Sequence, residues 1–332
     1  MTLSTKSIFL SDPTVSDSLA TWGERAIIEK LQKWFAGVSP ETPYGMGDDC
    51  AIVSIPAGRR QLFTTDHLTY GLHFDEQLTG EEAGMKLVKR NLSDIAAMGG
   101  EAGPALLTLL CGPDLSVPWL ETFISGIRKA CLKYNIQIIG GDVSELAAGS
   151  FSAGLAQTGT ISDAFKLRNT ARIGDKIYVT GSLGGSILGK HFLFEPRLAE
   201  GRWLAANPEC TAMMDLTDGL AKDLDAVLPE GSTAGVQIDK LPIAPAAYEW
   251  AKSTQKSALH HAFCDGEDYE LLFCCSSDTD DARFNASWSE AFPNLQIRQI
   301  GTIEHPGKAR YVDAKTAEPL RFESGFEHFL PR

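Results

Sequence analysis

The chain has 332 residues, of which 43% are hydrophobic and 22% are charged. This apolar content excludes a disordered chain, and domains of roughly 100–200 residues predict two domains. The 43 acidic residues outnumber the 30 basic residues and give a formal net charge of −13. Because nucleic acids and anionic membranes are bound by clustered Lys and Arg, this balance argues against both partners. No apolar run reaches the ~18–20 residues of a membrane-spanning helix.

The cysteines and the N-terminal residues favour a reducing compartment. The seven cysteines form an odd set without a C-x-x-C pair, and most lie in apolar segments, as small core residues do in a reducing cytosol. After Lys6 only the four residues SIFL precede a polar stretch, which is shorter than the roughly 7–15 apolar residues of a signal peptide. The cysteines and the N-terminal residues therefore favour a cytoplasmic protein.

The seven histidines lack the spacing of a zinc site.

Hydrophobic periodicity predicts alternating helices and strands in the first half of the chain. The predicted elements are a helix over 24–35, a strand over 61–65, a helix over 79–97, a strand over 106–110, a helix from Pro118 to Cys131 and a strand over 136–139. Thr79 and Glu82 have the spacing of a capping box at the start of the second helix. The polar, glycine-bearing stretch 144–150 is the expected domain junction, which predicts domains over 1–148 and 149–332.

The second half continues the alternation. Strands are predicted over 176–180, 212–216, 235–238, 270–275 and 296–303, with helices between most of them. The predicted fold class is therefore α/β (α+β) throughout.

Aspartates fall where predicted strands meet a turn or a helix. They are Asp48, Asp49, Asp66, Asp142, Asp215 and Asp218. In α/β folds ligands gather at such strand ends. Carboxylates that converge there repel one another unless a cation neutralises them, and Mg²⁺ prefers oxygen ligands together with substrate phosphates. The alternative is that each Asp only caps a turn or a helix, where this residue is common.

Three local patterns favour a metal site over isolated caps. The segment GMGDDCA at 45–51 places paired carboxylates between glycines and an apolar run. Thr64, Thr65 and Asp66 end a predicted strand with hard oxygen ligands. Asp215 and Asp218 are three residues apart, so both would face one ion if a helix begins there.

Asn91 and Asp94 lie three residues apart on one face of the predicted helix 79–97. A buried Asp94 needs a partner, and the pattern leaves two interpretations open, which are a metal ion and hydrogen bonds to the backbone.

Residues 184–191, GGSILGKH, nearly fit the phosphate-binding loop G-x-x-x-x-G-K-[ST]. His191 replaces the hydroxyl residue that binds Mg²⁺ in that motif, and Ile187 and Leu188 have the pattern of the buried face of a helix. We therefore predict an ordinary helix N-terminus here.

Seven motifs together carry a resemblance to a known family. They are GMGDDCA at 45–51, TTDHLTYGLHF at 64–74, NLSDIAAMGG at 91–100, IIGGD at 138–142, DLTDGL at 215–220, GEDYEL at 266–271 and GFEHF at 325–329. In these motifs and in their order the chain resembles the thiamine-monophosphate kinase family. That family belongs to the superfamily of aminoimidazole ribonucleotide synthetase and selenophosphate synthetase.

The resemblance implies phosphorylation of thiamine monophosphate to thiamine diphosphate by ATP, with several Mg²⁺ ions. We expect no catalytic base, because a phosphate monoester is already largely dianionic near neutral pH. The implied metal ligands are Asp49, Thr64, Thr65, Asp66, Asp94, Asp142, Asp215 and Asp218. The implied ATP contacts are Asp49, Thr65, Gly141, Asp142, Arg168 and Thr217, with Arg168 as a phosphate clamp. The implied substrate contacts are His73, Glu267 and Phe326.

The resemblance also implies an aminoimidazole ribonucleotide synthetase-like fold. Its N-terminal ATP- and Mg-binding domain would cover 1–148, and the sheet of that domain would pair across a homodimer. Its C-terminal domain, 149–332, would close over the substrate and ATP.

Other interpretations of these residues remain. Without the motifs, His73 is a polar cap on a strand, Glu267 is a loop acid, and Phe326 packs in the core like its neighbours Phe322 and Phe329. Another ATP-using enzyme of the same superfamily is the nearest alternative function. A non-catalytic nucleotide-binding module is the alternative from a different class.

Overall fold

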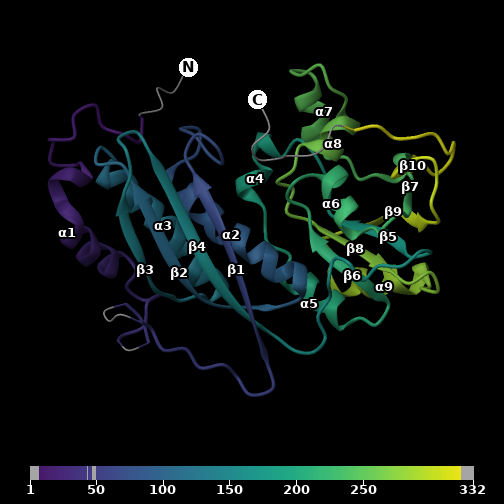
Figure 1. The fold of residues 1–332 in the computed structure, drawn as a ribbon, viewed down its shortest axis with the longest axis horizontal. Coiled ribbons are helices and arrows are strands. Elements are labelled where there is room, and N and C mark those ends of the chain that lie inside the picture. Colours follow the sequence, from purple (N-terminus) through teal and green to yellow (C-terminus); the bar gives the residue numbers. More distant parts are fainter. Residues whose placement is uncertain (1–6, 43, 47–49, 323–332) are drawn as a thin grey trace. The chain divides into compact units, whose positions relative to one another are not determined.

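The computed structural model describes residues 7–42, 44–46 and 50–322, which form two compact units (Figure 1). Unit 1 contains Met1–Ile95 and Glu101–Asp163, and unit 2 contains Ala96–Gly100 and Ala164–Arg332. Each unit has its own β-sheet and its own helices, which confirms the predicted mixed α/β class.

Unit 1 contains a four-stranded sheet. Its elements, in chain order, are α1 (Leu19–Trp34), β1 (Arg60–Thr69), α2 (Gly80–Met98), β2 (Glu101–Cys111), α3 (Val117–Tyr134), β3 (Ile138–Glu145) and β4 (Phe151–Ile161). The strand order is β1-β4-β2-β3. Strand β4 runs antiparallel to both β1 and β2, and β2 runs parallel to β3. Strands β1 and β3 are therefore the two edges of the sheet.

The two faces of this sheet have different surroundings. On one face Leu68, Leu107 and Leu155 are buried. Helix α3 packs on this face, where the rings of Phe123 and Phe151 lie 5.2 Å apart. Because successive side chains of a strand alternate between faces, the residues between the buried ones point the other way. On that other face Phe63 is 74% exposed and Leu106 is 45% exposed. We call it the uncovered face.

Several predicted elements of unit 1 are confirmed. Helix α2 begins at the predicted capping box, in which the Thr79 amide donates to Glu82 over 2.8 Å and the Glu82 amide donates to Thr79 Oγ1 over 3.2 Å. Helix α3 buries the predicted face, and Pro118 lies in its first turn. Residues 140–142, expected to follow the strand that begins at 136, instead lie inside β3.

The expected domain boundary at residue 148 differs from the division of the structure. Stretch 144–150 contains the end of β3 and the loop to β4, and the chain leaves unit 1 only after Asp163. Strand β4 lies in the middle of the sheet, but it carries Ser, Ala and Gly at 152–154 rather than the β-branched and aromatic residues that identify a strand. Its sequence gives no strong strand pattern, which is why the boundary was placed too early.

Unit 2 contains a six-stranded sheet in the order β10-β7-β9-β5-β8-β6. Its strands are β5 (Lys176–Thr180), β6 (Cys210–Asp215), β7 (Thr233–Val236), β8 (Leu271–Cys275), β9 (Ile297–Glu304) and β10 (Tyr311–Asp313). Its helices are η1 (Ser186–Leu188), α4 (Lys190–Leu193), α5 (Leu198–Ala206), α6 (Leu220–Val227), η2 (Ile238–Lys240), α7 (Pro245–Ala251), α8 (Ala258–Cys264) and α9 (Asp281–Ala291). The strand predicted over 176–180 is confirmed at both ends, and the other four predicted strands are correct to within two residues.

The sheet of unit 2 is buried on both faces. Val179 packs with residues of α6 and α8 in one hydrophobic cluster. Its neighbour Tyr178 packs with residues of α5 and α9 in a second cluster. This alternation places the sheet between two helical layers.

The thiols and the helices agree with the interpretation of the sequence. All seven cysteines are free, and Cys111, Cys131, Cys210, Cys274 and Cys275 are buried. Among the described residues, every helix is too short or too polar to cross a lipid bilayer.

The crossing of α2 and α3 depends on reciprocal glycines. A Cβ atom on Gly84 would lie 2.0 Å from Phe123 O, and a Cβ atom on Gly126 would lie 2.0 Å from Glu81 O. Both obstacles are helix backbone, so the helices would have to separate to admit a methyl group.

We expect Gly126→Ala to destabilise the chain by about 2 kcal/mol, because the clash outweighs the helix propensity of about 1 kcal/mol that alanine gains over glycine. Chemical denaturation measures the difference. Glu121→Ala, at an exposed position of the same helix, is the control and should change stability by less than about 0.5 kcal/mol. Equal stability of Gly126→Ala and the control would contradict the close crossing.

Candidate active site

The first group of predicted ligands lies between β1 and α2. Thr64 and Asp66 alternate along β1 and therefore share a face. On that face the Thr64 hydroxyl donates to Asp94 of α2, and Asp66 pairs with Arg90 of α2 at 3.3 Å. Two predicted ligands on β1, Thr64 and Asp66, therefore lie against the helix that carries Asp94. Asn91 is fully buried and donates its amide to Leu87 O over 2.9 Å.

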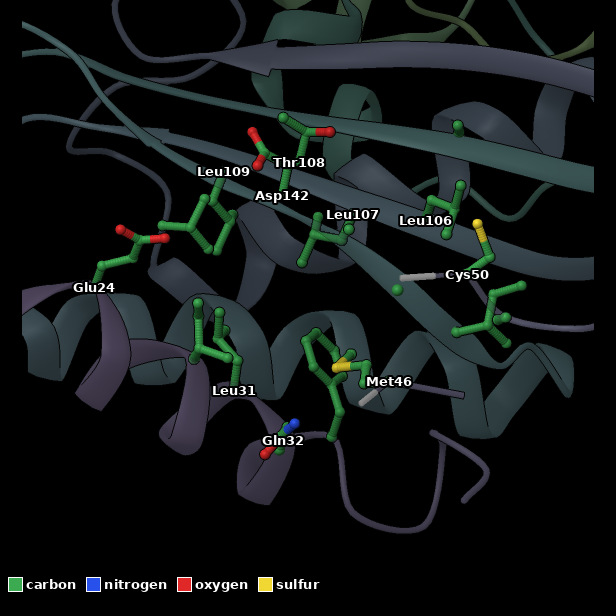
Figure 2. Close-up of a pocket in the computed structure, with 18 residues that line it drawn as sticks. Glu24, Leu31, Gln32, Met46, Cys50, Leu106, Leu107, Thr108, Leu109 and Asp142 are labelled. Atoms are coloured by element: carbon green, nitrogen blue, oxygen red, sulfur yellow. The ribbon is translucent and has the colours of Figure 1, made fainter. Parts of the chain in front are cut away.

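The second group lies on β3, beside a cavity of about 970 Å³. Gly141 and Asp142 line it, and Figure 2 shows Asp142 next to Thr108 of β2. A Cβ atom on Gly141 would lie 1.7 Å from Leu107 O, so only glycine lets the two strands approach this closely. Ser144 Oγ donates to the Asp142 carboxylate over 2.8 Å. Leu106, Leu107 and Leu109 give the cavity an apolar wall.

Asp66 and Asp142 lie at opposite edges and on opposite faces of the sheet of unit 1. One row of paired residues crosses the sheet through Asp66, Leu155, Leu107 and Gly141. Three strand spacings separate its ends, which is about 14 Å. Asp142 pairs with Thr108, which alternates with buried leucines, so Asp142 lies on the uncovered face with Thr65. Within unit 1, Asp66 and Asp142 therefore do not meet at one ion.

The third group is the loop that follows β6. It carries Asp215, Thr217 and Asp218, but α6 begins only at Leu220, so Asp215 and Asp218 do not share the helical turn that their spacing suggested. Asp218 pairs with Lys222 at 2.7 Å. No group of three or more His, Cys, Asp or Glu side chains placed to hold a metal occurs within residues 7–42, 44–46 and 50–322. The eight-ligand assignment therefore stays a prediction.

Asp223 holds this loop, although no motif singled it out. Its Oδ2 accepts the backbone amides of Thr217, Asp218 and Gly219 over 2.9, 3.0 and 3.2 Å. Burial and then the charge of Asp218 raise the pKa of Asp223 to about 7, while the three amides lower it. An acid in the first turn of a helix is the signal that would have identified it.

The GEDYEL segment separates one surface acid from two buried ones. The side chain of Glu267 is 30% exposed, whereas those of Asp268 and Glu270 are 2% exposed. The Glu267 amide donates to Thr217 O over 2.7 Å, and the Tyr269 amide donates to Leu216 O over 2.8 Å. These backbone bonds place Glu267 beside the third group of predicted ligands.

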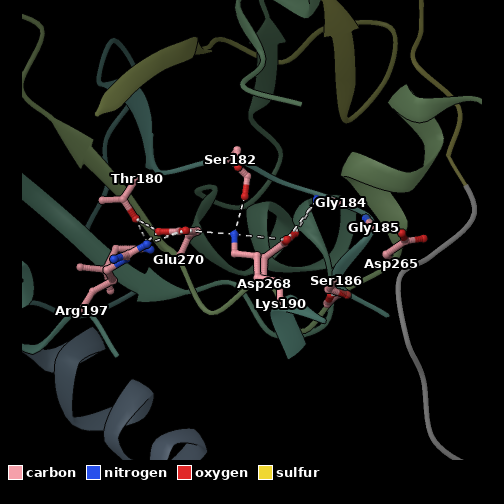
Figure 3. A network of polar contacts seen from close by, with 12 residues as sticks. Thr180, Ser182, Gly184, Gly185, Ser186, Lys190, Arg197, Asp265, Asp268 and Glu270 are labelled. Carbon is pink, nitrogen blue, oxygen red and sulfur yellow. Dashed lines mark hydrogen bonds and ion pairs between the residues drawn. The ribbon is translucent and has the colours of Figure 1, made fainter. Parts of the chain in front are cut away.

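The two buried acids are neutralised by neighbouring side chains and amides (Figure 3). Arg197 donates twice to Glu270 over 2.8 Å, and Lys190 lies 2.9 Å from the same carboxylate. Burial alone would raise the pKa of Glu270, but these cations outweigh burial and hold it below its usual value. Burial raises the pKa of Asp268 to about 7, although Lys190 and the Gly184 amide oppose the change.

This network also shows what Lys190 contacts in residues 184–191, the segment that nearly fits a phosphate-binding loop. The ammonium of Lys190 contacts Glu270, Asp268 and Ser182 O instead of forming a phosphate-binding loop. The helix N-terminus expected here is only a 3₁₀ turn, since Gly189 at φ 136° ends it at once. Ile187 and Leu188 are 52% and 49% exposed, so the expectation that they form a buried helical face was wrong.

The remaining predicted residues lie apart from these groups or outside the described residues. His73 follows β1, and its Nδ1 accepts the amide of Thr69 over 3.0 Å, which is the strand cap considered from the sequence. Arg168 is exposed in a turn of unit 2. Asp49 and Phe326 lie outside the described residues.

Comparison with known proteins identifies the family. The family described as AIR synthase related protein, N-terminal domain, matches residues 47–161. The thiamine-monophosphate kinase of Rhodopirellula baltica is 35% identical over 299 residues, which are 87% of this chain and 92% of that protein. The chain belongs to the thiamine-monophosphate kinase family.

Solved thiamine-monophosphate kinases share the fold. The enzyme from Stenotrophomonas maltophilia K279a superposes with a TM-score of 0.72 at 27% identity, over 88% of this chain and 96% of that one. AaThiL, complexed with AMPPCP and TMP, superposes with a TM-score of 0.68 at 27% identity, over 93% of this chain and 97% of that one. The predicted two-domain architecture of this kinase family is thereby confirmed.

We expect Asp223→Ala to destabilise the chain by about 2–3 kcal/mol, because it leaves the amides of the 217–219 loop without their carboxylate acceptor. Chemical denaturation gives the loss, and hydrogen exchange should accelerate at those amides in particular. Asp225→Ala, which removes an exposed acid of the same helix, is the control and should cost less than about 1 kcal/mol. Unchanged exchange at 217–219 would show that Asp223 does not hold the loop.

Proposed function

We propose that the chain transfers the γ-phosphate of ATP to thiamine monophosphate and so forms thiamine diphosphate. The observation that carries this proposal is the 35% identity to the Rhodopirellula baltica kinase over 87% of the chain. The relative AaThiL, solved with AMPPCP and TMP, aligns over 93% of the chain and supports the same pair of substrates. A cytoplasmic location suits such a reaction.

The predicted metal ligands have the chemistry of a magnesium site. The described ones are carboxylates and hydroxyls, and they are Thr64, Thr65, Asp66, Asp94, Asp142, Asp215 and Asp218. Hard oxygen donors of this kind are those that Mg²⁺ prefers. When bound, Mg²⁺ offsets charge on the phosphates and aligns them. In this proposal Asp49 completes the set.

The cavity beside β3 is the proposed nucleotide site. Its volume of about 970 Å³ lies within the usual range of ligand pockets, roughly 300–1,000 Å³. Leu106 offers an apolar contact to a base, and Gly141 and Asp142 line the cavity where the polar part of the nucleotide would lie. The further proposed ATP contacts are Asp49, Thr65, Arg168 and Thr217.

The transfer needs alignment of donor and acceptor rather than a catalytic base. A phosphate monoester is already largely dianionic near neutral pH, so its oxygen attacks the γ-phosphorus directly. Arg168, exposed and cationic, is the proposed clamp for the transferring group. His73, Glu267 and Phe326 are the proposed contacts of the acceptor. Glu267 is suited to the cationic thiazolium or the aminopyrimidine, because a carboxylate stabilises positive charge and accepts N–H donors.

The uncovered face supports a homodimer in which N-terminal sheets pair. Phe63 and Leu106 are 74% and 45% exposed there, and large exposed apolar residues on one sheet face favour an interface. Thr65 and Asp142 share this face. A second copy would cover the apolar residues and complete the surroundings of these two ligands.

We expect Asp66→Asn to lower turnover roughly 100-fold or more while leaving the fold intact, because an amide binds Mg²⁺ less strongly than a carboxylate. The measurement is a coupled assay for thiamine diphosphate across a Mg²⁺ titration, with circular dichroism as the check of folding. Asp163→Asn, at an exposed surface acid, is the control. Wild-type turnover of Asp66→Asn at every Mg²⁺ concentration would refute the metal assignment, and accumulation of a phosphoenzyme would refute direct transfer.

We expect the wild type to sediment as a dimer and Phe63→Lys with Leu106→Lys to sediment as a monomer, because like charges on the uncovered face cannot be buried without partners. Leu132→Lys, at an exposed apolar position on α3, is the matched control and should remain dimeric. Analytical ultracentrifugation at micromolar concentration makes the measurement. A monomeric wild type would exclude the proposed pairing.

A further inference from the structure

Two buried side chains lie beside the carboxylate of Glu267, one at each of its oxygens. The Tyr269 hydroxyl donates to Oε1 over 3.1 Å, and His191 Nδ1 lies 3.6 Å from Oε2. Tyr269 is 2% exposed and His191 is 6% exposed, whereas the Glu267 side chain is 30% exposed. This partly exposed acid therefore accepts one hydrogen bond from a buried tyrosine and has a buried histidine close to its other oxygen.

The backbone of this segment is held in a conformation that ordinary residues avoid. Glu267 has φ 51° and Tyr269 has φ 50°, both in the left-handed region. Such conformations persist where the surrounding structure fixes them, and they cluster at functional sites. Here the 216–217 carbonyls accept both amides, and the carboxylates of Asp265 and Asp268 accept the amides of Gly185 and Gly184 (Figure 3).

The ring of Tyr269 is also fixed. It stacks on Phe194 with a centroid separation of 3.8 Å and an interplanar angle of 14°. The ring is buried as well as stacked, so the hydroxyl that bonds Glu267 belongs to a side chain with little freedom to move.

We propose that Tyr269 and His191 are positioning residues that aim the Glu267 carboxylate at a cationic heterocycle with an exocyclic amino group. The proposal rests on the proposed function, in which Glu267 faces the thiazolium or the aminopyrimidine of the acceptor. Tyr269 and His191 act through Glu267, and neither transfers a proton during the reaction. Their effect falls on binding of the acceptor and not on ATP or on the transfer step.

The test compares Tyr269→Phe with the wild type in the thiamine diphosphate assay. Removing the hydroxyl keeps the stacked ring, so we expect KM for thiamine monophosphate to rise about tenfold, since a hydrogen bond to a charged group is lost. We expect kcat and KM for ATP to stay within about twofold. Tyr178→Phe is the matched control, because Tyr178 is also buried and stacked and donates to the carboxylate of Asp281.

A double-mutant cycle decides whether Tyr269 acts through Glu267. Glu267→Gln changes an accessible side chain and is expected to raise KM for thiamine monophosphate at least as much. Adding Tyr269→Phe to it should then raise KM by less than about twofold, because the orienting bond no longer serves a carboxylate. Additive effects would overturn the proposal, as would an unchanged KM in Tyr269→Phe. His191→Ala should raise KM by less than Tyr269→Phe, because 3.6 Å is beyond hydrogen-bond distance.

Isothermal titration of thiamine monophosphate separates this proposal from the proposed function. Weaker binding by Tyr269→Phe than by Tyr178→Phe supports the positioning role even if the wild type forms no thiamine diphosphate, in which case only the proposed function fails. Turnover by the wild type with equal binding by both variants overturns the positioning role alone. A wild type that neither binds nor converts thiamine monophosphate overturns both.

Discussion

The cost of placing carboxylates out of water constrains the acidic loops of this chain. Where an acid is buried, cationic side chains or backbone amides of the chain itself offset this cost. Arg197 and Lys190 surround Glu270, whose side chain is 2% exposed, and backbone amides of the 217–219 loop surround Asp223. Asp66 and Asp218 differ, because their side chains are 29% and 36% exposed and pair with Arg90 and Lys222. Acids of the first kind are neutralised inside the fold, whereas Asp66 and Asp218 belong to the set that we propose binds Mg²⁺.

This distinction separates what the sequence can predict from what it cannot. Motifs identified the family and the architecture, and periodicity located helix α2 with its capping box and strand β5. The same motifs contain both kinds of acid, however. In GEDYEL the letters alone do not show that Glu267 reaches the surface while its neighbours are buried, because that outcome depends on Lys190 and Arg197, which are far away in the chain.

Long-range pairing explains the other differences. Asp66 and Asp142 both follow the pattern of an acid at a strand end, but the insertion of β4 between β1 and β2 moves their strands to opposite edges of the sheet. Because β4 is rich in small residues, its central position has no strong local signal. Asp223 was missed for a similar reason, since its role depends on the fold of the loop before it. Local sequence patterns predict which polar residues lie in loops, whereas the pairing of the strands determines which of those residues lie close together.

The net charge of −13 argues against polyanionic partners, yet ATP is itself a polyanion. The two statements agree once the acids are divided by their surroundings. Buried acids such as Glu270 already have internal cations and contribute little to the field outside. In the proposed site, accessible acids at the strand ends bind divalent cations, and a bound cation would reverse the local sign and so favour phosphate. A surplus of acids is therefore compatible with binding a nucleotide, provided that the cation binds with it, and it still disfavours a polyanion that arrives without one.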